Sequence, residues 1–239
     1  MVSKDYRFTV GYTYYDEPEL LSEQIKLWNR YPHQIEIILV DDGSQKYPAE
    51  NYTSLIEHPG FRLYKVDEDL GFNSHGCRNL IAHVSSSDNI LFSDIDCHFS
   101  PETMAFLKRI SFNTEKFYKF SFYYPNAFQY HVYPGHPNVF LVNKKIFWEA
   151  GGYDESFTGW HTGDREFLVR LNTVSKQSMI NESIGFTLVR GGRKSILDTT
   201  VDKIQYDNDK MVISLPSKMP KDLKGTVTKK INFSYSRIL

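Results

Sequence analysis

Two carboxylates stand two residues apart in the stretch FSDIDCHFSPE, directly after an apolar run. On a β-strand, residues i and i+2 share a side, so Asp94 and Asp96 would point the same way. Two hard oxygen ligands aimed at one point suit a divalent cation. The residues alone leave open a second interpretation, a strand that ends in a solvated turn, with Ser100 and Pro101 opening the next helix.

A second acid pair, Asp41 and Asp42, follows the apolar run IEIILV and precedes Gly43 and Ser44. α/β sheets bind ligands at the carboxyl ends of their strands, and an Asp there can accept hydrogen bonds from ribose hydroxyls or from a base N–H. An Asx turn that caps the next segment explains the same four residues equally well.

A loop with two glycines, residues 71–79, leads into a predicted helix. Gly71 and Gly76 would let the backbone approach a ligand closely, and Arg78 offers a planar fork for a phosphate. The loop is neither the dinucleotide-binding fingerprint nor a P-loop, because Gly76 is not followed by Lys and then Ser or Thr.

A third acid group lies in GDREF, residues 163–167. On a helix, Asp164 shares a face with Leu168 and Leu171, so its carboxylate is predicted to point toward the protein body. It is either a helix-capping acid or a catalytic base. Glu166 shares another face with Arg170, and this pair is interpreted as a solvent-facing ion pair.

These groups need a scaffold, and the hydrophobic pattern of the first half supplies alternating strands and helices. Burial of the run IEIILV on both faces is typical of a parallel sheet covered by helices. The pattern predicts a doubly wound α/β sheet with ligands beyond the carboxyl ends of its strands. Strands are predicted at 6–13, 35–40, 61–66, 89–92, 118–123 and 139–142, helices at 18–30, 73–84, 101–110, 145–150 and 163–172, and a loop at 125–137.

The composition of the 239 residues favours one compact unit with a sizeable core. We expect a main domain at 1–189 and a β-rich or irregular extension at 190–239 packed on it. Two cysteines are too few for a disulfide framework, so free thiols in a reducing compartment are expected. No apolar run is long enough to span a bilayer, and the first residues lack a signal peptide's apolar stretch. The expected protein is soluble, intracellular and cytoplasmic.

The charge is unevenly distributed along the chain. From Arg190 onward there are 11 Lys and Arg against 5 Asp, a net charge of +6, which leaves −7 for the first 189 residues. A basic region on an acidic body suggests an anionic partner, either nucleic acid or a phosphorylated lipid surface. A solvated, lysine-rich periphery is the alternative.

Four motifs in one order resemble the inverting nucleotide-sugar glycosyltransferases of family 2, which have the GT-A fold. They are VDDGS after the second strand, G-x-x-x-x-G-x-R-N before a helix, D-x-D followed by Pro and Glu, and GGYDE…GW…GD.EF..R. The resemblance covers Phe8 to about Leu171. It implies a mixed sheet flanked by helices, with a small irregular C-terminal region.

The resemblance also implies roles for particular residues. Asp164 would be the catalytic base, Asp96 a ligand of Mn²⁺ or Mg²⁺, and Asp94 a contact of the ribose or the metal. The donor would be a nucleoside-diphosphate sugar, with UDP-sugars expected first. Trp160 and Tyr153, with Phe157, could form an apolar platform for the acceptor. The implied donor-binding residues are Thr13, Asp16 or Glu17, Asp42, Arg78 and Asp94.

Two departures from the family pattern concern the acceptor and the metal. The family usually has Glu-Asp where this chain has Gly163-Asp164, and many relatives supply a metal-binding His beyond the base, whereas the last His here is His161. A glycan acceptor is the leading expectation. The alternatives are a hydroxymethylated base in DNA, an anionic lipid-linked glycan, or a protein that binds sugar nucleotides or glycans without turnover. A sugar-phosphate nucleotidyltransferase is disfavoured, because no Gly-rich basic loop follows the first strand.

Overall fold

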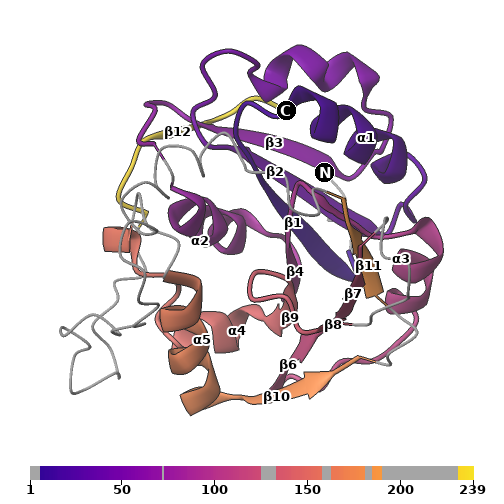
Figure 1. The fold of residues 1–239 in the computed structure, drawn as a ribbon, viewed down its shortest axis with the longest axis vertical. Coiled ribbons are helices and arrows are strands. Elements are labelled where there is room, and N and C mark those ends of the chain that lie inside the picture. The colour runs from indigo at the N-terminus through magenta and orange to yellow at the C-terminus, as the bar shows by residue number, and fades with distance from the viewer. Residues whose placement is uncertain (1–5, 72, 125–132, 158–162, 181–184, 190–230) are drawn as a thin grey trace.

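The core of the molecule is a mixed β-sheet in which four neighbouring strands run parallel (Figure 1). The computed structural model describes residues 6–71, 73–124, 133–157, 163–180, 185–189 and 231–239. Every residue of the second strand is buried, as the run IEIILV predicted. In spatial order, the parallel strands are β4 (Asn89–Asp94), β1 (Phe8–Tyr14), β2 (Ile35–Asp41) and β3 (Phe61–Val66).

Further strands extend this sheet on both sides. Beyond β4 come β9 (Phe140–Asn143), β6 (Lys116–Lys119) and β10 (Lys176–Met179), and beyond β3 comes β12 (Tyr235–Arg237). β9 is antiparallel to both β4 and β6, and β12 is antiparallel to β3, which makes the sheet mixed. A second, smaller sheet has the order β5 (Cys97–His98), β11 (Gly185–Leu188), β7 (Ser121–Tyr123) and β8 (Tyr133–Pro134).

Helices cover both faces of the large sheet because alternate strand residues are apolar on both sides. On β2, Ile37 and Leu39 pack in one cluster, while Ile38 and Val40 pack in the other. The first cluster includes residues of α1 (Pro18–Trp28), η1 (Ala49–Leu55) and α3 (Pro101–Leu107). The second includes residues of α2 (Ser74–Val84), α4 (Lys144–Glu149) and α5 (Gly163–Val174). A short 3₁₀ turn, η2 (Glu155–Phe157), precedes α5.

The predicted α/β class is confirmed, and one strand prediction is wrong. The segment 118–123, interpreted as one strand, is divided between β6 of the large sheet and β7 of the small one. Phe120 lies between them and is fully buried against Phe99. The aromatic pattern marks the segment as buried strand but does not show that the chain changes sheets there.

The last described segment, residues 231–239, lies against the body of the domain. β12 extends the edge next to β3, and the Asn232 amide donates a hydrogen bond to the Glu155 carboxylate. The predicted boundary at residue 190 and most of the basic region lie outside the described residues, so the division into 1–189 and 190–239 stays a prediction. Among the described helices, none is both long and apolar enough to cross a membrane.

Candidate active site

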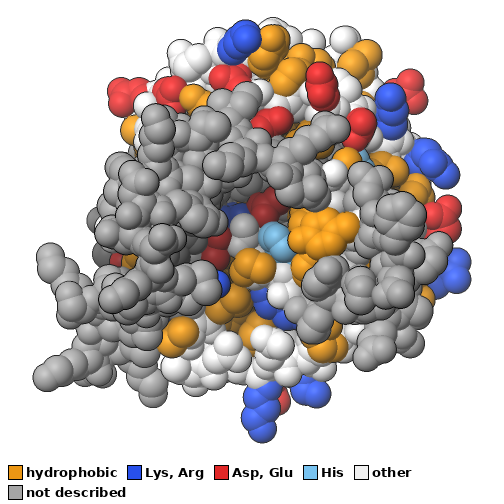
Figure 2. Space-filling model, viewed as in Figure 1, with side chains coloured by type: hydrophobic (Ala, Val, Ile, Leu, Met, Phe, Trp, Pro, Cys, Tyr) orange, Lys and Arg blue, Asp and Glu red, His pale blue; other side chains and the backbone are white. Residues whose placement is uncertain are grey.

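Three parallel strands bring polar residues to one edge of the sheet. In the strand register, Thr13 of β1 lies opposite Asp94 of β4, and Tyr14 lies opposite Asp41 of β2. Because parallel strands end at a common edge, residues far apart in sequence meet there. Acidic, basic and histidine side chains gather near the centre of the face seen in Figure 2.

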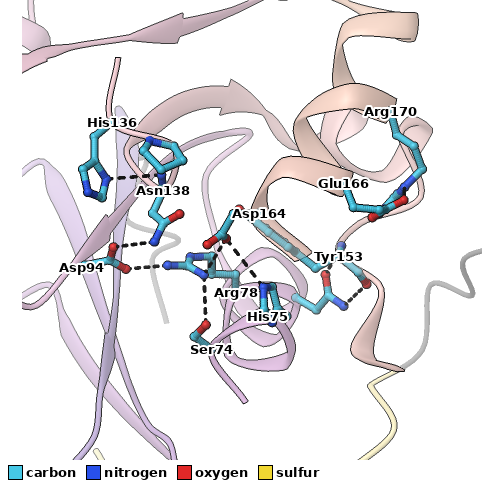
Figure 3. Close-up of polar contacts among 12 residues, drawn as sticks. Ser74, His75, Arg78, Asp94, His136, Asn138, Tyr153, Asp164, Glu166 and Arg170 are labelled. Carbon is cyan, nitrogen blue, oxygen red and sulfur yellow. Dashed lines mark hydrogen bonds and ion pairs between the residues drawn. The ribbon is translucent and has the colours of Figure 1, made fainter. Parts of the chain in front are cut away.

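Arg78 of α2 joins two of the predicted site carboxylates (Figure 3). Its guanidinium donates to Asp94 Oδ1 at 2.5 Å and to Asp164 Oδ1 at 3.2 Å. A further bond reaches Ser74 Oγ at 3.2 Å. The Arg78 side chain is only 1% exposed, against 9% for Asp164 and 19% for Asp94. The structure therefore brings together one residue from each of three sequence motifs, with a buried cation between two acids.

The charges of this triad support one another. Burial alone would raise the pKa of Asp94, but Arg78, His136 and the Asn138 amide outweigh it and hold that pKa below its usual range. Burial opposes the charge of Arg78 as well, yet Asp94 and Asp164 outweigh it and raise the pKa of the guanidinium. Asp94 and Arg78 are therefore an ion pair at neutral pH.

The segment after β8 supplies partners that the sequence analysis missed. Asn138 Nδ2 donates to Asp94 Oδ2 at 3.0 Å. Lys119 holds this segment in place, because its Nζ donates to the carbonyl oxygens of His136 at 2.8 Å and Pro137 at 2.7 Å. Burial lowers the pKa of Lys119 to about 7, although Asp164 partly opposes this. No motif pointed to these residues; the one available signal was a lysine inside the apolar run FYKF.

Asp96 does not lie where the strand argument placed it. β4 ends at Asp94, and residues 95 and 96 form a turn before β5. The prediction that Asp94 and Asp96 share one side of a continuous strand is therefore wrong. Asp96 is only partly buried, and the Cys97 thiol lies 3.6 Å from its Oδ1. Its role as a metal ligand stays a prediction.

The two aspartates after β2 have different environments. Asp41 accepts hydrogen bonds from the backbone amides of Ser44 at 2.8 Å and Ala49 at 2.7 Å, which is the Asx-turn interpretation. Asp42 Oδ2 accepts from the Asn73 amide at 2.9 Å, but its buried Oδ1 has no hydrogen-bond partner within the described part of the chain. Burial raises the pKa of Asp42 to about 8. The Asx-turn interpretation thus applies to Asp41, and contact of Asp42 with a donor stays a prediction.

Asp16 supports the loop after β2. Its carboxylate accepts from the backbone amides of Lys46 at 3.0 Å and Tyr47 at 2.6 Å, and its own amide donates to Ser44 Oγ at 2.9 Å. Its φ of 46° is a left-handed conformation that Asp tolerates better than most residues. Glu17 precedes α1 and makes no capping bond with its side chain. Contact of either residue with a donor stays a prediction.

Tyr153 does not lie at the surface, where the predicted aromatic platform for an acceptor would need it. This side chain is fully buried, and its ring stacks on Phe167 with centroids 4.2 Å apart. It has no exposed face for a sugar ring, so the structure places it in the core instead. Trp160 lies outside the described residues.

The pair Glu166 and Arg170 was interpreted as solvent-facing, and that interpretation is wrong. The ion pair exists, with Arg170 Nε 2.5 Å from Glu166 Oε1, but the exposed fractions are only 7% for Glu166 and 2% for Arg170. Arg170 also donates to the carbonyl oxygens of Ala150 and Gly152 (Figure 3 labels the pair). These two carbonyl oxygens lie outside regular strands and helices and therefore need a side-chain donor. By supplying it, Arg170 holds α5 against the chain that follows α4.

Gly163, the departure beside Asp164, faces a buried imidazole. A Cβ built at this position would lie 2.5 Å from Nε2 of His75. The His75 side chain is fully buried, and its Nε2 lies 3.8 Å from Asp164 Oδ1. His75 therefore occupies the space that any longer side chain at position 163 would need. This explains why the acidic residue expected from the family pattern is replaced by glycine in this chain.

We expect Gly163→Ala to lower the free energy of unfolding by about 1–3 kcal/mol, the usual cost of overpacking a buried site. Alanine's better helix propensity offsets up to about 1 kcal/mol of this cost. In a His75→Ala background the same change should be neutral or stabilising, because the ring is gone. Urea unfolding of the four proteins gives the coupling. Equal effects of Gly163→Ala in both backgrounds would show that the contact has no energetic weight.

The fold and the site together define a class of protein. A mixed α/β sheet flanked by helices, with acids at its carboxyl edge, is the architecture of the GT-A glycosyltransferases. Residues 12–127 match the model of a family described as "Glycosyltransferase like family 2". The match covers just under half of the chain, and this part is similar to glycosyltransferase family 2.

Solved structures with the same fold include S. aureus TarS and a mannosyltransferase. S. aureus TarS 1-349 in complex with UDP-GlcNAc is 13% identical, with a TM-score of 0.61 over 81% of this chain and 60% of that chain. The mannosyltransferase PcManGT from Pyrobaculum calidifontis, in complex with GDP-Man and Mn²⁺, is 14% identical, with a TM-score of 0.59 over 78% of this chain and 58% of that chain. The chain thus spans about three fifths of the TarS 1-349 and PcManGT chains, and 36% of a longer TarS chain. The comparison with curated proteins gave no match.

Proposed function

We propose that the protein transfers a sugar from a nucleoside-diphosphate donor to a hydroxyl group of a glycan, with inversion at the anomeric carbon. One observation carries the proposal: buried Arg78 bridges Asp94 and Asp164, so that the acid implied in donor binding and the acid implied as base face one point. A sugar transferase needs both functions at one reaction centre, where the reacting atoms are held about 3–3.5 Å apart.

The donor would lie along the strand ends, with its base near Asp42. Among the described residues, the buried Oδ1 of Asp42 has no oxygen or nitrogen partner within hydrogen-bond distance, and a base N–H would supply one. Thr13 lies beside Asp94 in the register and places a hydroxyl along the same edge. The solved complexes of TarS with UDP-GlcNAc and of PcManGT with GDP-Man support a nucleoside-diphosphate sugar. UDP-sugars are the first donors to test and GDP-sugars the second.

The charges around Asp94 suit a divalent cation. The carboxylates of Asp94 and Asp164 share the guanidinium of Arg78, Asp96 lies in the next turn, and a pKa of about 7 leaves Lys119 only partly charged. The group therefore keeps a net negative charge for a cation to neutralise. When bound, Mn²⁺ or Mg²⁺ would offset the negative charge that builds on the leaving diphosphate. The PcManGT complex, which contains Mn²⁺, supports this assignment.

Asp164 would act as the base. Its carboxylate lies at the first turn of α5, where Arg78 stabilises its negative charge. The acid would take the proton from the acceptor hydroxyl as that oxygen attacks the anomeric carbon, and the nucleoside diphosphate would leave from the opposite side. A single displacement inverts the centre and needs one base, in contrast to the carboxylate pairs of glycosidases.

The test is release of the nucleoside diphosphate from UDP- and GDP-sugars in the presence of Mn²⁺, with and without oligosaccharide acceptors. Proton NMR of the product then gives the anomeric configuration. Binding of a donor without release of nucleoside diphosphate, for every donor and acceptor tested, would favour a protein that binds sugar nucleotides without turnover. The ion pair of Asp164 with Arg78 and the glycine at position 163 are compatible with such a protein. Retention at the anomeric centre would exclude the single displacement.

An acceptor in DNA is the second alternative, and salt dependence distinguishes it. Contacts with phosphates make the logarithm of the affinity fall linearly with the logarithm of the salt concentration. Binding of DNA at low salt, lost when Lys229 and Lys230 become Ala, would favour this acceptor. If the protein does not bind DNA, and the variant with Ala at positions 229 and 230 still transfers sugar to glycans at the normal rate, the DNA acceptor is excluded. The basic region is then only a solvated part of the surface.

We expect Asp96→Ala to abolish the Mn²⁺ dependence of UDP binding. Loss of the carboxylate removes a hard oxygen ligand beside the diphosphate, and Mn²⁺ prefers such ligands. Calorimetric titration of UDP with and without Mn²⁺ measures the effect. Asp88→Ala is the matched control, because Asp88 is an exposed acid beyond the opposite end of β4. If Mn²⁺ enhanced UDP binding equally in the Asp96 variant, the metal would have to be held by other residues.

A further inference from the structure

One group of side chains beside the donor site has the ligand types of a different metal. Asp94 at the end of β4, Cys97 at the start of β5 and His136 after β8 each direct one ligand atom to a common region, and these atoms lie within 4.8 Å of one another. Figure 3 shows His136 and Asn138 beside Asp94. The proposed function above uses neither the thiol nor the imidazole.

We propose that Asp94, Cys97 and His136 form a site for a sulfur-binding divalent cation of the Zn²⁺ type, distinct in its ligands from a site for Mn²⁺ at Asp94 and Asp96. One oxygen, one sulfur and one nitrogen are the mixed set that Zn²⁺ and Co²⁺ take, whereas Mn²⁺ and Mg²⁺ prefer oxygen alone. Three protein ligands leave a fourth tetrahedral position open for water or a phosphate oxygen.

The spacing of the ligand atoms allows this geometry. Bonds of about 2.0–2.3 Å at tetrahedral angles place ligand atoms about 3.3–3.8 Å apart, so a spread of up to 4.8 Å closes with side-chain adjustments of about 1 Å. His136 lies in the segment that Lys119 fastens, and its ring packs edge-on against Phe122 with centroids 5.6 Å apart. Cys97 is fixed by its pairing with Leu188 of β11.

The charge balance favours binding. Asp94 already offsets Arg78, so the nearby Asp96 and Asp164 leave the region negative even when Lys119 is charged. Binding would form a metal–sulfur bond and release the proton of the Cys97 thiol to solvent, which adds one more negative charge against the two of the cation. No oxidant or other reactant is needed.

Both metal sites use the Asp94 carboxylate, whose two oxygens already accept hydrogen bonds from Arg78 and Asn138. A Zn²⁺-type ion would therefore compete with Mn²⁺ for the same ligand. We therefore expect such an ion to oppose Mn²⁺-supported donor binding. This consequence depends on the proposed function, whereas the site itself does not.

Cobalt gives a direct test of the site, because thiolate ligation of Co²⁺ produces charge-transfer absorption in the near ultraviolet. The metal-free protein, titrated with Co²⁺ alone, should develop this absorption at one equivalent and lose it when Zn²⁺ is added. Cys97→Ser should abolish it. Cys77→Ser should retain it, and this is a matched control because both cysteines are fully buried and free.

His136→Gln should weaken Co²⁺ binding by at least about tenfold. Loss of a residue that only hydrogen-bonds to a metal ligand already costs roughly that much, and His136 is proposed as a ligand itself. If the Cys97 variant fails to fold, Cys77→Ser still gives a decision: Cys97 is then the one cysteine left in the sequence, so thiolate absorption in that variant comes from Cys97. Absence of the thiolate absorption in the wild type or in Cys77→Ser, or its persistence in Cys97→Ser, would overturn the proposal. None of these measurements uses a sugar donor, so failure of the proposed function would leave them unchanged.

Discussion

Arg78→Ala is expected to lower the free energy of unfolding by about 3–5 kcal/mol and to abolish transfer. The guanidinium is 1% exposed and is the cation between Asp94 and Asp164. Removing one partner of a buried ion pair is costly because it leaves the other charge without compensation, and here two carboxylates lose the same partner. Denaturant unfolding measures the stability, and nucleoside-diphosphate release measures the transfer.

A second buried pair separates the loss of stability from the loss of function. Arg62 pairs with Glu36, which is fully buried at the start of β2, the end of the strand opposite Asp41. Arg62→Ala should therefore destabilise the fold while leaving donor binding per folded molecule unchanged. Equal effects of both variants on donor binding would mean that Arg78 acts through stability alone.

Arg78→Lys separates charge from geometry. Lysine restores one positive charge but lacks the planar fork that reaches two carboxylates at once. We expect partial recovery of stability without recovery of transfer. Full recovery of both would show that the bridge between Asp94 and Asp164 is not required.

Local patterns were enough to predict the elements that carry the site. The bounds predicted for β3 agree with the structure, and α2 begins one residue after the predicted start. These segments have clear alternation or helical periodicity and are bounded by turn residues, so local pattern and tertiary packing agree. The acids at Asp42, Asp94 and Asp164 follow or begin such elements, which is why sequence could locate them.

The remaining features depend on contacts between distant segments. Lys119 and Asn138 reach the site because β6 and β9 pair beside β4, and no local signal encodes that pairing. The sequence predicts an exposed Glu166 because the spacing to Arg170 is the same for a surface pair and for a buried one. Only the carbonyls that Arg170 meets after α4 decide between them. The turn after Asp94 was missed for a similar reason, since DID alternates like a strand.

Asp164→Asn is expected to lower turnover by about 10²- to 10⁴-fold while donor affinity is retained. Asparagine has nearly the same size and keeps an oxygen for Arg78, but it cannot take a proton from the acceptor hydroxyl. The measurements are the initial rate at saturating donor and calorimetric titration of the nucleoside diphosphate. A loss of affinity in step with the loss of rate would indicate a role in binding instead.

Glu166→Gln provides the matched control for this prediction. Glu166 lies two residues further along α5, is as deeply buried as Asp164 when the whole residue is counted, and also pairs with a buried arginine. Its loss should cost stability but leave turnover per folded molecule near that of the wild type, because its carboxylate faces Arg170 and not Asp94. Near-normal turnover in Asp164→Asn would transfer the role of base to another acid. Asp154 and Glu155 are the next candidates, and Glu155 is the weaker of the two because both of its carboxylate oxygens already accept hydrogen bonds, from Asn79 and Asn232.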